Sequence, residues 1–338
     1  MLLTCQSGFE SLLARELTEL HGVTVKAHGP GWTEIAAPTD PLPLLRSAAF
    51  PHLSLLTPVE VKGDSVNALA GAVVEHFLTS MRGERIEAAW PRWWAGPHEL
   101  VGLGRRIGAV EAAFQLQLKK RLSRVARLAT SDLPRATGPA RGLFVWFTDF
   151  GRALVAREAF VHGPRRMADD PLAPSRSYLK VEEAYVVLGR EPQAGESVCD
   201  LGAAPGGWSY SAAKRGARVV AVDNGPLKGG ALDNPAIEHR REDAFRFGPP
   251  EGQTYDWLFC DMVEEPHHVL RDIIEPWLAR RWCRRLVVNL KFGRVDAIGL
   301  LRELRSPLAP LREHVSALRV HHLYHDREEF TLVGEVAS

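Results

Sequence analysis

The second half of the chain alternates apolar runs typical of strands with patterns typical of helices. This regular alternation predicts an α/β fold with a mostly parallel, doubly wound sheet. Ligands of such sheets bind at the carboxyl ends of the strands, so functional residues are expected directly after the strand patterns. The strand patterns lie at residues 197–201, 218–222, 257–260 and 286–291, with a weaker one near 236–239, and the helical patterns at 178–188, 208–215 and 266–280.

Length and linker composition predict more than one domain. A chain of 338 residues is long enough for two or three domains of ~100 to 200 residues each. Residues 161–177 contain Pro, Gly and Asp and show no apolar periodicity, which is typical of a linker. We therefore predict a domain boundary between residues 165 and 166.

The overall composition indicates no particular partner, because the formal net charge is only +1. The cysteines have neither a CxxC pair nor a zinc-type spacing to histidine, which predicts buried thiols in a reducing compartment and no metal site. The N-terminus has no basic segment followed by a long apolar stretch, and no run of ~18 apolar residues occurs, so we expect a cytoplasmic protein without a membrane span. The four cysteines are Cys5, Cys199, Cys260 and Cys283.

Residues 111–128 predict an amphipathic helix with one basic face. A solvated helix surface explains such a face, and so does RNA binding, which neighbouring cations and aromatic side chains favour. Trp93 and Trp94, beside Arg92, could stack on bases or belong to the core. The basic residues are Lys119, Lys120, Arg121, Arg124 and Arg127, with Arg105, Arg106, Arg165, Arg166 and Arg176 nearby in the sequence.

A glycine-rich turn follows the strand pattern at residues 197–201. Its sequence, Asp-Leu-Gly-Ala-Ala-Pro-Gly-Gly-Trp, does not fit the G-x-G-x-x-G pattern of dinucleotide sites. Asp200, Pro205 and the Gly206-Gly207 pair fit S-adenosylmethionine instead. Asp223 ends the next strand pattern, where a carboxylate can bind two ribose hydroxyls, and Asp243 follows the weak strand, where an acid can accept from an adenine amine. Singly, each acid could equally be a cap or a surface charge.

The residues after the strand at 257–260 narrow the choice among the chemical classes of methyl acceptor. Enzymes that methylate amide or exocyclic nitrogens usually carry Asn or Asp, two prolines and an aromatic residue here, whereas this chain has Cys260-Asp261-Met-Val-Glu. Cys260 lies inside the apolar strand, which disfavours a cysteine nucleophile. A ribose hydroxyl remains. Its proton needs a base, and Lys291 can serve if its pKa falls from ~10.4, through burial or through a second cation such as Lys180. An interdomain ion pair is the alternative for Lys291 taken alone.

Lys180, Asp261, Lys291 and Glu329 occur in the order and spacing of the Lys-Asp-Lys-Glu tetrad of FtsJ-like ribose 2′-O-methyltransferases, which the chain resembles over about residues 170–332. The resemblance implies a Rossmann-like methyltransferase domain at residues 166–338 that uses S-adenosylmethionine. Strings such as Leu-Tyr-His-Asp-Arg-Glu-Glu are most similar to members that methylate a cytidine of 23S rRNA before ribosome assembly is complete. Residues 3–17 resemble the start of those members, which implies a ferredoxin-like domain at residues 1–55 and a THUMP-type RNA-binding domain at 56–165.

The same resemblance implies residue roles. Lys291 would take the 2′-hydroxyl proton, Lys180 and Asp261 would set its charge and orient the hydroxyl, and Glu329, rather than its rival Glu328, would hold a lysine. A ribose methyltransferase for tRNA or for another rRNA site remains an alternative. A non-catalytic RNA-binding protein is a second one, although it should have lost part of the turn or the tetrad. The expected cofactor-binding residues are Ser177, Gly202, Ala204, Pro205, Gly206, Gly207, Asp223, Asp243 and Asp261.

Overall fold

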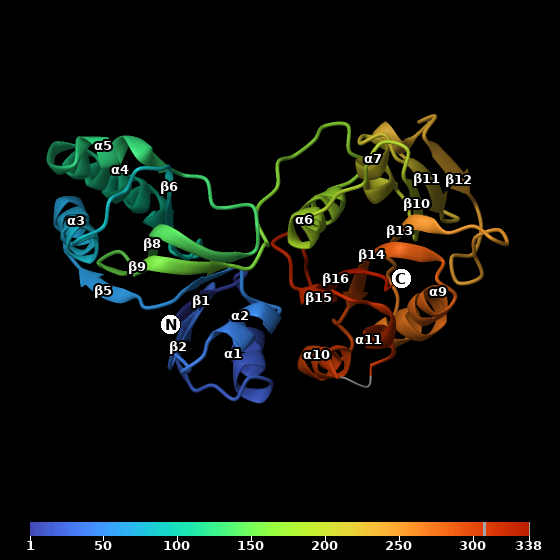
Figure 1. The fold of residues 1–338 in the computed structure, drawn as a ribbon, viewed down its shortest axis with the longest axis horizontal. Helices are drawn as coiled ribbons and strands as arrows, with labels where there is room; N and C mark the ends of the chain where they lie inside the picture. Colours follow the sequence, from blue (N-terminus) through green and yellow to red (C-terminus); the bar gives the residue numbers. More distant parts are fainter. Residues whose placement is uncertain (307–308, 338) are drawn as a thin grey trace. The chain divides into compact units, whose positions relative to one another are not determined.

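The computed structural model describes residues 1–306 and 309–337 and divides the chain into two compact units (Figure 1). The first unit contains Met1–Arg46 and Phe50–His162. The second contains Ser47–Ala49 and the described residues from Gly163 onward. The chain therefore leaves the first unit between His162 and Gly163, within the stretch that lacks apolar periodicity.

One sheet runs through the whole first unit, in the order β2-β3-β1-β4-β9-β8-β6-β7, with β5 also paired to β9. β4 pairs with β1 on one side and β9 on the other, so the segments 1–55 and 56–165 share this sheet. The strands are β1 (Leu2–Thr4), β2 (Val25–Gly29), β3 (Trp32–Ile35), β4 (Leu53–Leu55), β5 (Val59–Lys62), β6 (Trp90–Ala95), β7 (Ala129–Thr130), β8 (Gly138–Asp149) and β9 (Arg152–Val161). The helices are α1 (Glu10–Glu19), α2 (Leu42–Ser47), α3 (Val66–Ser80), α4 (Leu103–Arg121) and α5 (Ser123–Leu128).

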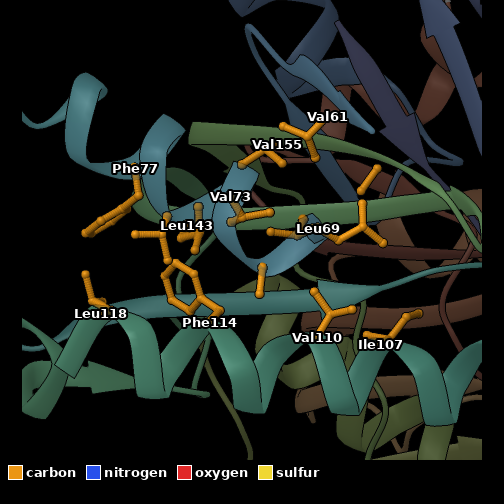
Figure 2. Packing of buried hydrophobic residues seen from close by; sticks show 14 of the residues in the cluster. Val61, Leu69, Val73, Phe77, Ile107, Val110, Phe114, Leu118, Leu143 and Val155 are labelled. Atoms are coloured by element: carbon orange, nitrogen blue, oxygen red, sulfur yellow. The ribbon is translucent and has the colours of Figure 1, made fainter. Parts of the chain in front are cut away.

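The larger core of this unit joins α3 and α4 to strands of the sheet (Figure 2). Phe114 and Leu118 of α4 are fully buried there, as the apolar spacing of residues 111–128 predicts. Phe114 meets the ring of Phe77 of α3 edge-on, at a centroid distance of 6.1 Å. Burying a side chain of this size stabilises the fold by about 1.5 to 3 kcal/mol relative to exposure. The apolar face of the basic helix is therefore a core face.

The predicted single helix over residues 111–128 is wrong in one respect, because it is interrupted at Leu122 (φ −140°, ψ 69°). The interruption separates α4 from α5. Carbonyls of α5 accept hydrogen bonds from two side chains outside it, the Trp90 indole to Val125 and the Gln115 amide to Ala126, each at 2.9 Å. These contacts fix the short α5 against β6 and α4, a tertiary effect that helical periodicity alone does not contain.

The second unit contains a seven-stranded sheet in the order β12-β11-β10-β13-β14-β16-β15 (Figure 1). The five neighbouring strands β12, β11, β10, β13 and β14 are parallel, while β16 is antiparallel to both β14 and β15. The predicted mostly parallel, doubly wound α/β sheet is therefore confirmed. The strands are β10 (Ser197–Leu201), β11 (Arg218–Val222), β12 (Ile237–Arg240), β13 (Tyr255–Cys260), β14 (Cys283–Lys291), β15 (Arg319–His321) and β16 (Glu329–Glu335). The helices are α6 (Tyr178–Leu188), α7 (Gly207–Ala213), η1 (Gly229–Ala231), α8 (Pro266–Val269), the π-helical η2 (Leu270–Ile274), α9 (Glu275–Ala279), α10 (Ala297–Arg305) and α11 (Pro310–His314).

The strand order reverses at β10, which has β11 on one side and β13 on the other. This is the topological switch point at which doubly wound sheets leave a crevice for a ligand, beyond the carboxyl ends of the strands. The glycine-rich turn follows β10 there, and Asp261 follows β13 on the neighbouring strand. The topology therefore places the two sequence features at one end of the sheet.

Candidate active site

Two lysines and two carboxylates from four separate segments of the chain meet in the second unit. Lys291, the last residue of β14, donates hydrogen bonds to Asp261 and to Glu329. Lys180 of α6 forms an ion pair with Glu329, and its Nζ lies 3.6 Å from Asp261 Oδ2. We call these four residues the ion square, since opposite charges alternate around it.

The register of the strands explains why residues so far apart in the sequence meet. β14 and β16 are antiparallel, and Lys291 lies directly opposite Glu329. Side chains directly opposite on one face of an antiparallel pair are close neighbours. On the other side of β14, Cys260 pairs with Val288, so Asp261 follows β13 level with the end of β14. Of the two adjacent glutamates, Glu329 contacts both lysines, whereas the Glu328 side chain is exposed.

The electrostatics of the square differ from the sequence-based expectation for Lys291. Burial is the largest single effect and lowers its pKa, but Asp261 and Glu329, by charge and hydrogen bonding, together raise the pKa above the ordinary lysine value. The pKa of Lys291 is therefore not depressed in this arrangement, because the two carboxylates outweigh burial. Conversely, although burial raises the pKa of Glu329, Lys180 and Lys291 lower it overall.

Sequence reasoning missed a buried polar chain behind the square. Asn289 donates from Nδ2 to Asp261 Oδ1 at 3.3 Å, and Thr331 contacts Asn289 Oδ1 at 2.5 Å and Asp326 Oδ2 at 2.9 Å. Asn289 and Thr331 are opposite each other in the β14–β16 register. They precede Lys291 and follow Glu329 by two residues, so strand periodicity places them on the same face as the square. That spacing was the available signal, whereas no sequence pattern singles out Asp326.

The turn after β10 has the backbone form that its glycines predict. Gly202 and Gly206 have φ values of 75° and 104°, a region that favours glycine. Gly206 immediately precedes α7, and a Cβ at Gly207 would lie 2.8 Å from the Ser177 hydroxyl. Trp208 donates its indole N–H to the Ser177 carbonyl at 2.9 Å, which ties the start of α6 to α7. The predicted cofactor residue Ser177 is thus adjacent to the turn.

Asp223 is adjacent to the same turn. Its Oδ2 accepts from the Ala204 N–H at 3.0 Å, and its Oδ1 accepts from the Gly225 N–H at 2.7 Å. Each carboxylate oxygen has a second lone pair, so the side chain retains acceptor capacity for hydroxyls. The Asp223 carboxylate is therefore bound directly to the turn at Ala204, which Pro205, Gly206 and Gly207 follow.

The other acids of the second unit's sequence motifs have different surroundings. Asp200 is buried and accepts from the Ser209 hydroxyl at 2.6 Å, and burial raises its pKa to about 7, so it links β10 to α7. Asp243 is exposed, and its carboxylate accepts from the Phe245 N–H at 3.0 Å. This hydrogen bond lies within a turn, and Arg246 Nε is 3.6 Å from the other carboxylate oxygen of Asp243. Neither Phe245 nor Arg246 belongs to the glycine turn.

The cysteines are poor candidates for nucleophiles. All four are buried thiols, and burial raises the pKa of Cys260 to about 12, which disfavours the reactive thiolate. The part of the chain that the structure describes contains no group of three or more His, Cys, Asp or Glu side chains placed to hold a metal ion. Within the same residues, no helix is both long and apolar enough to cross a membrane.

Comparison with known proteins agrees with this geometry. Residues 173–283 match the family model described as FtsJ-like methyltransferase. Two proteins named ribosomal RNA large subunit methyltransferase M are similar over nearly the whole chain. The one from Halorhodospira halophila is 31% identical over 350 residues, covering 98% of this chain and 95% of the relative. The one from Alkalilimnicola ehrlichii is 33% identical over 361 residues, covering 98% and 93%.

The sheet, the turn at its switch point and the FtsJ-like match define a methyltransferase that uses S-adenosylmethionine. The similarity to the two relatives extends through both units of the chain. The chain belongs to the ribosomal RNA large subunit methyltransferase M family.

Proposed function

We propose that this protein transfers a methyl group from S-adenosylmethionine to the ribose 2′-hydroxyl of a cytidine in 23S rRNA, before the ribosomal subunit is assembled. The observation that carries the proposal is the ion square, in which Lys180, Asp261, Lys291 and Glu329 surround one point at the strand ends. The names of the relatives supply the large-subunit rRNA. A base methyltransferase would have no evident use for two paired lysines at this place.

The residues at the switch point fit the cofactor. When bound, S-adenosylmethionine supplies a methyl group on a positively charged sulfur. Asp223 offers a carboxylate for ribose hydroxyls, and Gly202 and Gly206, with no Cβ, leave the backbone accessible. We propose Ala204, Pro205, Gly207, Ser177, Asp243 and Asp261 as the further cofactor contacts.

Lys291 is the proposed general base for the hydroxyl proton. A lysine amine must be neutral before it accepts a proton, and in the structure two carboxylates hold Lys291 in its charged form. Two changes favour the neutral amine. A positive charge brought beside the square lowers the pKa of Lys291, and an RNA chain that excludes water adds to desolvation, which is already its largest single effect. Lys180 then keeps Glu329 neutralised, so the square does not lose all its positive charge.

The first unit is the proposed RNA-binding part, composed of a ferredoxin-like segment (1–55) and a THUMP-type segment (56–165). Exposed basic residues of α4 and α5 support this role. Within residues 1–306 and 309–337, Lys119, Lys120, Arg124 and Arg127 form no ion pair, whereas Arg121 pairs with Glu75. Unpaired cations are available for phosphates. Trp93 and Trp94 are half-buried against core clusters, which favours the core alternative for them. Four buried thiols suit the cytoplasm as the place of action.

The test is transfer of labelled methyl from S-adenosylmethionine to a 23S rRNA transcript, followed by alkaline hydrolysis. A 2′-O-methyl group blocks attack on the neighbouring phosphate, so the proposal expects one alkali-resistant dinucleotide that contains a cytidine. Label in an alkali-sensitive nucleotide would refute the ribose chemistry. Label in tRNA alone would keep the chemistry and replace the substrate. Lys291→Ala should abolish transfer while leaving cofactor affinity nearly unchanged, since a tenfold loss of affinity would make Lys291 a binding residue.

A further inference from the structure

A continuous chain of hydrogen bonds connects the ion square to a fully buried acid. It runs from Asp261 through Asn289 and Thr331 to Asp326, and the last three side chains are each about 1% exposed. Asp326 comes from the loop before β16, three residues ahead of Glu329. No bond in the chain is longer than 3.3 Å, so the orientation of one member constrains the next.

The hydrogen atoms along this chain can be counted from its square end. An ionised Asp261 only accepts, so the amide nitrogen of Asn289 faces it and the amide oxygen faces Thr331. That oxygen needs a donor, and the Thr331 hydroxyl, whose Oγ1 lies 2.5 Å from Asn289 Oδ1, has a single hydrogen to donate. Thr331 Oγ1 is then an acceptor on its other side, toward the two oxygens of Asp326 at 2.9 and 3.2 Å. Only a protonated carboxyl can donate to it.

An ionised Asp326 would reverse this order. It would take the Thr331 hydrogen for itself and leave the Asn289 oxygen buried without its donor, which is costly for a group away from water. The remaining contact of Asp326, the Leu323 N–H to Oδ2 at 2.9 Å, is compatible with either form. The count of hydrogens therefore favours the neutral acid.

We propose that Asp326 is a positioning residue that works as a neutral carboxylic acid, because its proton orients Thr331 and Asn289 and so holds Asp261 against Lys291. The proposal rests on the proposed function for the role of Lys291, but the orientation of the chain does not depend on the identity of the methyl acceptor. It assigns to Asp326 no contact with cofactor or RNA.

The charges around Asp326 agree with the neutral form. Burial is the largest effect, the negative charge of Glu329 adds to it, and although Lys180 acts in the opposite direction, the pKa of Asp326 is raised to about 8. Glu183 of α6 is a second buried carboxyl facing this region, and its own pKa is raised by burial, with Asp326 contributing. Asp261 is linked to Asp326 through Asn289 and Thr331. As pH rises through about 8, Asp326 ionises and the proposed orientation is lost.

The experiment compares kcat for methyl transfer across pH in the full-length protein and four variants. Asp326→Asn keeps a donor toward Thr331 and an acceptor toward Leu323, so its kcat should be near the wild-type value at neutral pH. Deprotonation of Lys291 raises kcat with pH in both proteins, but above pH 8 the ratio of wild-type to Asp326→Asn kcat should fall, because only the wild type loses the proton of Asp326. Asp326→Ala and Thr331→Val should lower kcat by about 5- to 150-fold, the range for one lost buried hydrogen bond. Thr331→Ser, which keeps the hydroxyl, should restore it. The affinity for S-adenosylmethionine should stay unchanged in all four.

Three results would overturn the proposal. Asp326→Asn as inactive as Asp326→Ala would mean that the negative charge is needed. Equal pH profiles for wild type and Asp326→Asn through pH 8 would mean that its ionisation has no effect. A wild-type minus Asp326→Asn infrared difference spectrum without a protonated-carboxyl band at pH 6.5 would show an ionised acid directly, with no need for activity. Label on a base instead of a ribose would refute the proposed function but would leave this comparison interpretable.

Discussion

The charge of Glu329 should control the pH at which Lys291 becomes a base, and Glu329→Gln tests this with little change of shape. Glu329 is buried, with a side-chain exposure of only 4%, so water screens its charge weakly. It is one of two carboxylates that raise the pKa of Lys291. An opposite charge at hydrogen-bonding distance shifts a pKa by about 1 to 3 pH units, which corresponds to about 1.4 to 4 kcal/mol. Removing the charge should lower the pKa of Lys291 by that amount.

The sign of the effect on rate follows from the proton balance. The neutral amine is the reactive form, so the rate rises with pH, reaches its midpoint where Lys291 is half deprotonated, and levels off above it. A lower pKa places that midpoint at a lower pH, and Glu329→Gln should therefore move the rising limb about 1 to 3 pH units toward acid. The maximal rate should fall as well, because Lys180 loses the nearer of its two ion-pair partners and the square loses its geometry.

The assay is single-turnover methyl transfer with saturating cofactor and RNA, quenched rapidly at each pH. It is best carried out in the Asp326→Asn background, since Glu329 also raises the pKa of Asp326. Glu328→Gln is the matched control, because the neighbouring side chain is exposed and contacts neither lysine of the square. A midpoint that stays in place, or moves to higher pH, in a folded Glu329→Gln protein that still binds cofactor would refute the assignment of Lys291 as the titrating base.

Two further predictions concern the binding residues. Asp223→Ala should weaken cofactor binding by about 1 to 3 kcal/mol, the value for hydrogen bonds to a charged group, and calorimetry that finds an unchanged affinity would reject the ribose assignment. Neutralising Lys119, Lys120 and Arg124 together should lower RNA affinity and flatten its dependence on salt by roughly one unit of slope per lost phosphate contact. The control removes the same number of charges at Lys26, Arg46 and Arg82, which are exposed elsewhere in the first unit, and an equal slope for the two triple variants would return α4 and α5 to an ordinary solvated surface.

Most of the second unit was predictable because its strands are buried on both faces and read as apolar runs. The predicted ranges 197–201 and 218–222 coincide with β10 and β11, and 178–188 coincides with α6. The break at Leu122 was not predictable from periodicity, because the Trp90 indole that holds α5 comes from a strand 35 residues away from its acceptor, Val125. The sequence around residues 111–128 therefore does not indicate this contact.

The ion square could be anticipated as a set of residues but not as an electrostatic balance. The order of two lysines and two acids along the chain was readable, and so was their position at strand ends. The net direction of the Lys291 pKa shift was not readable. It depends on whether the two carboxylates lie close enough to outweigh burial, which lowers the pKa. The structure decides this by hydrogen bonds from Lys291 to both Asp261 and Glu329. The sequence gives the charged residues but not the distances between them, and these distances decide the direction of the pKa shift.

The antiparallel direction of β16 is what completes the proposed catalytic site at the end of this sheet. A parallel sheet places only the carboxyl ends of its strands at the ligand edge, so β13 and β14 can supply Asp261 and Lys291. Because β16 runs the other way, it contributes its first residue, Glu329, at that same edge, opposite the last residue of β14. The next same-face pair is Asn289 with Thr331, and the loop that leads into β16 carries Asp326. One register thus fixes both the square and the chain behind it, and a slip of one residue would turn Glu329 and Thr331 to the other face together.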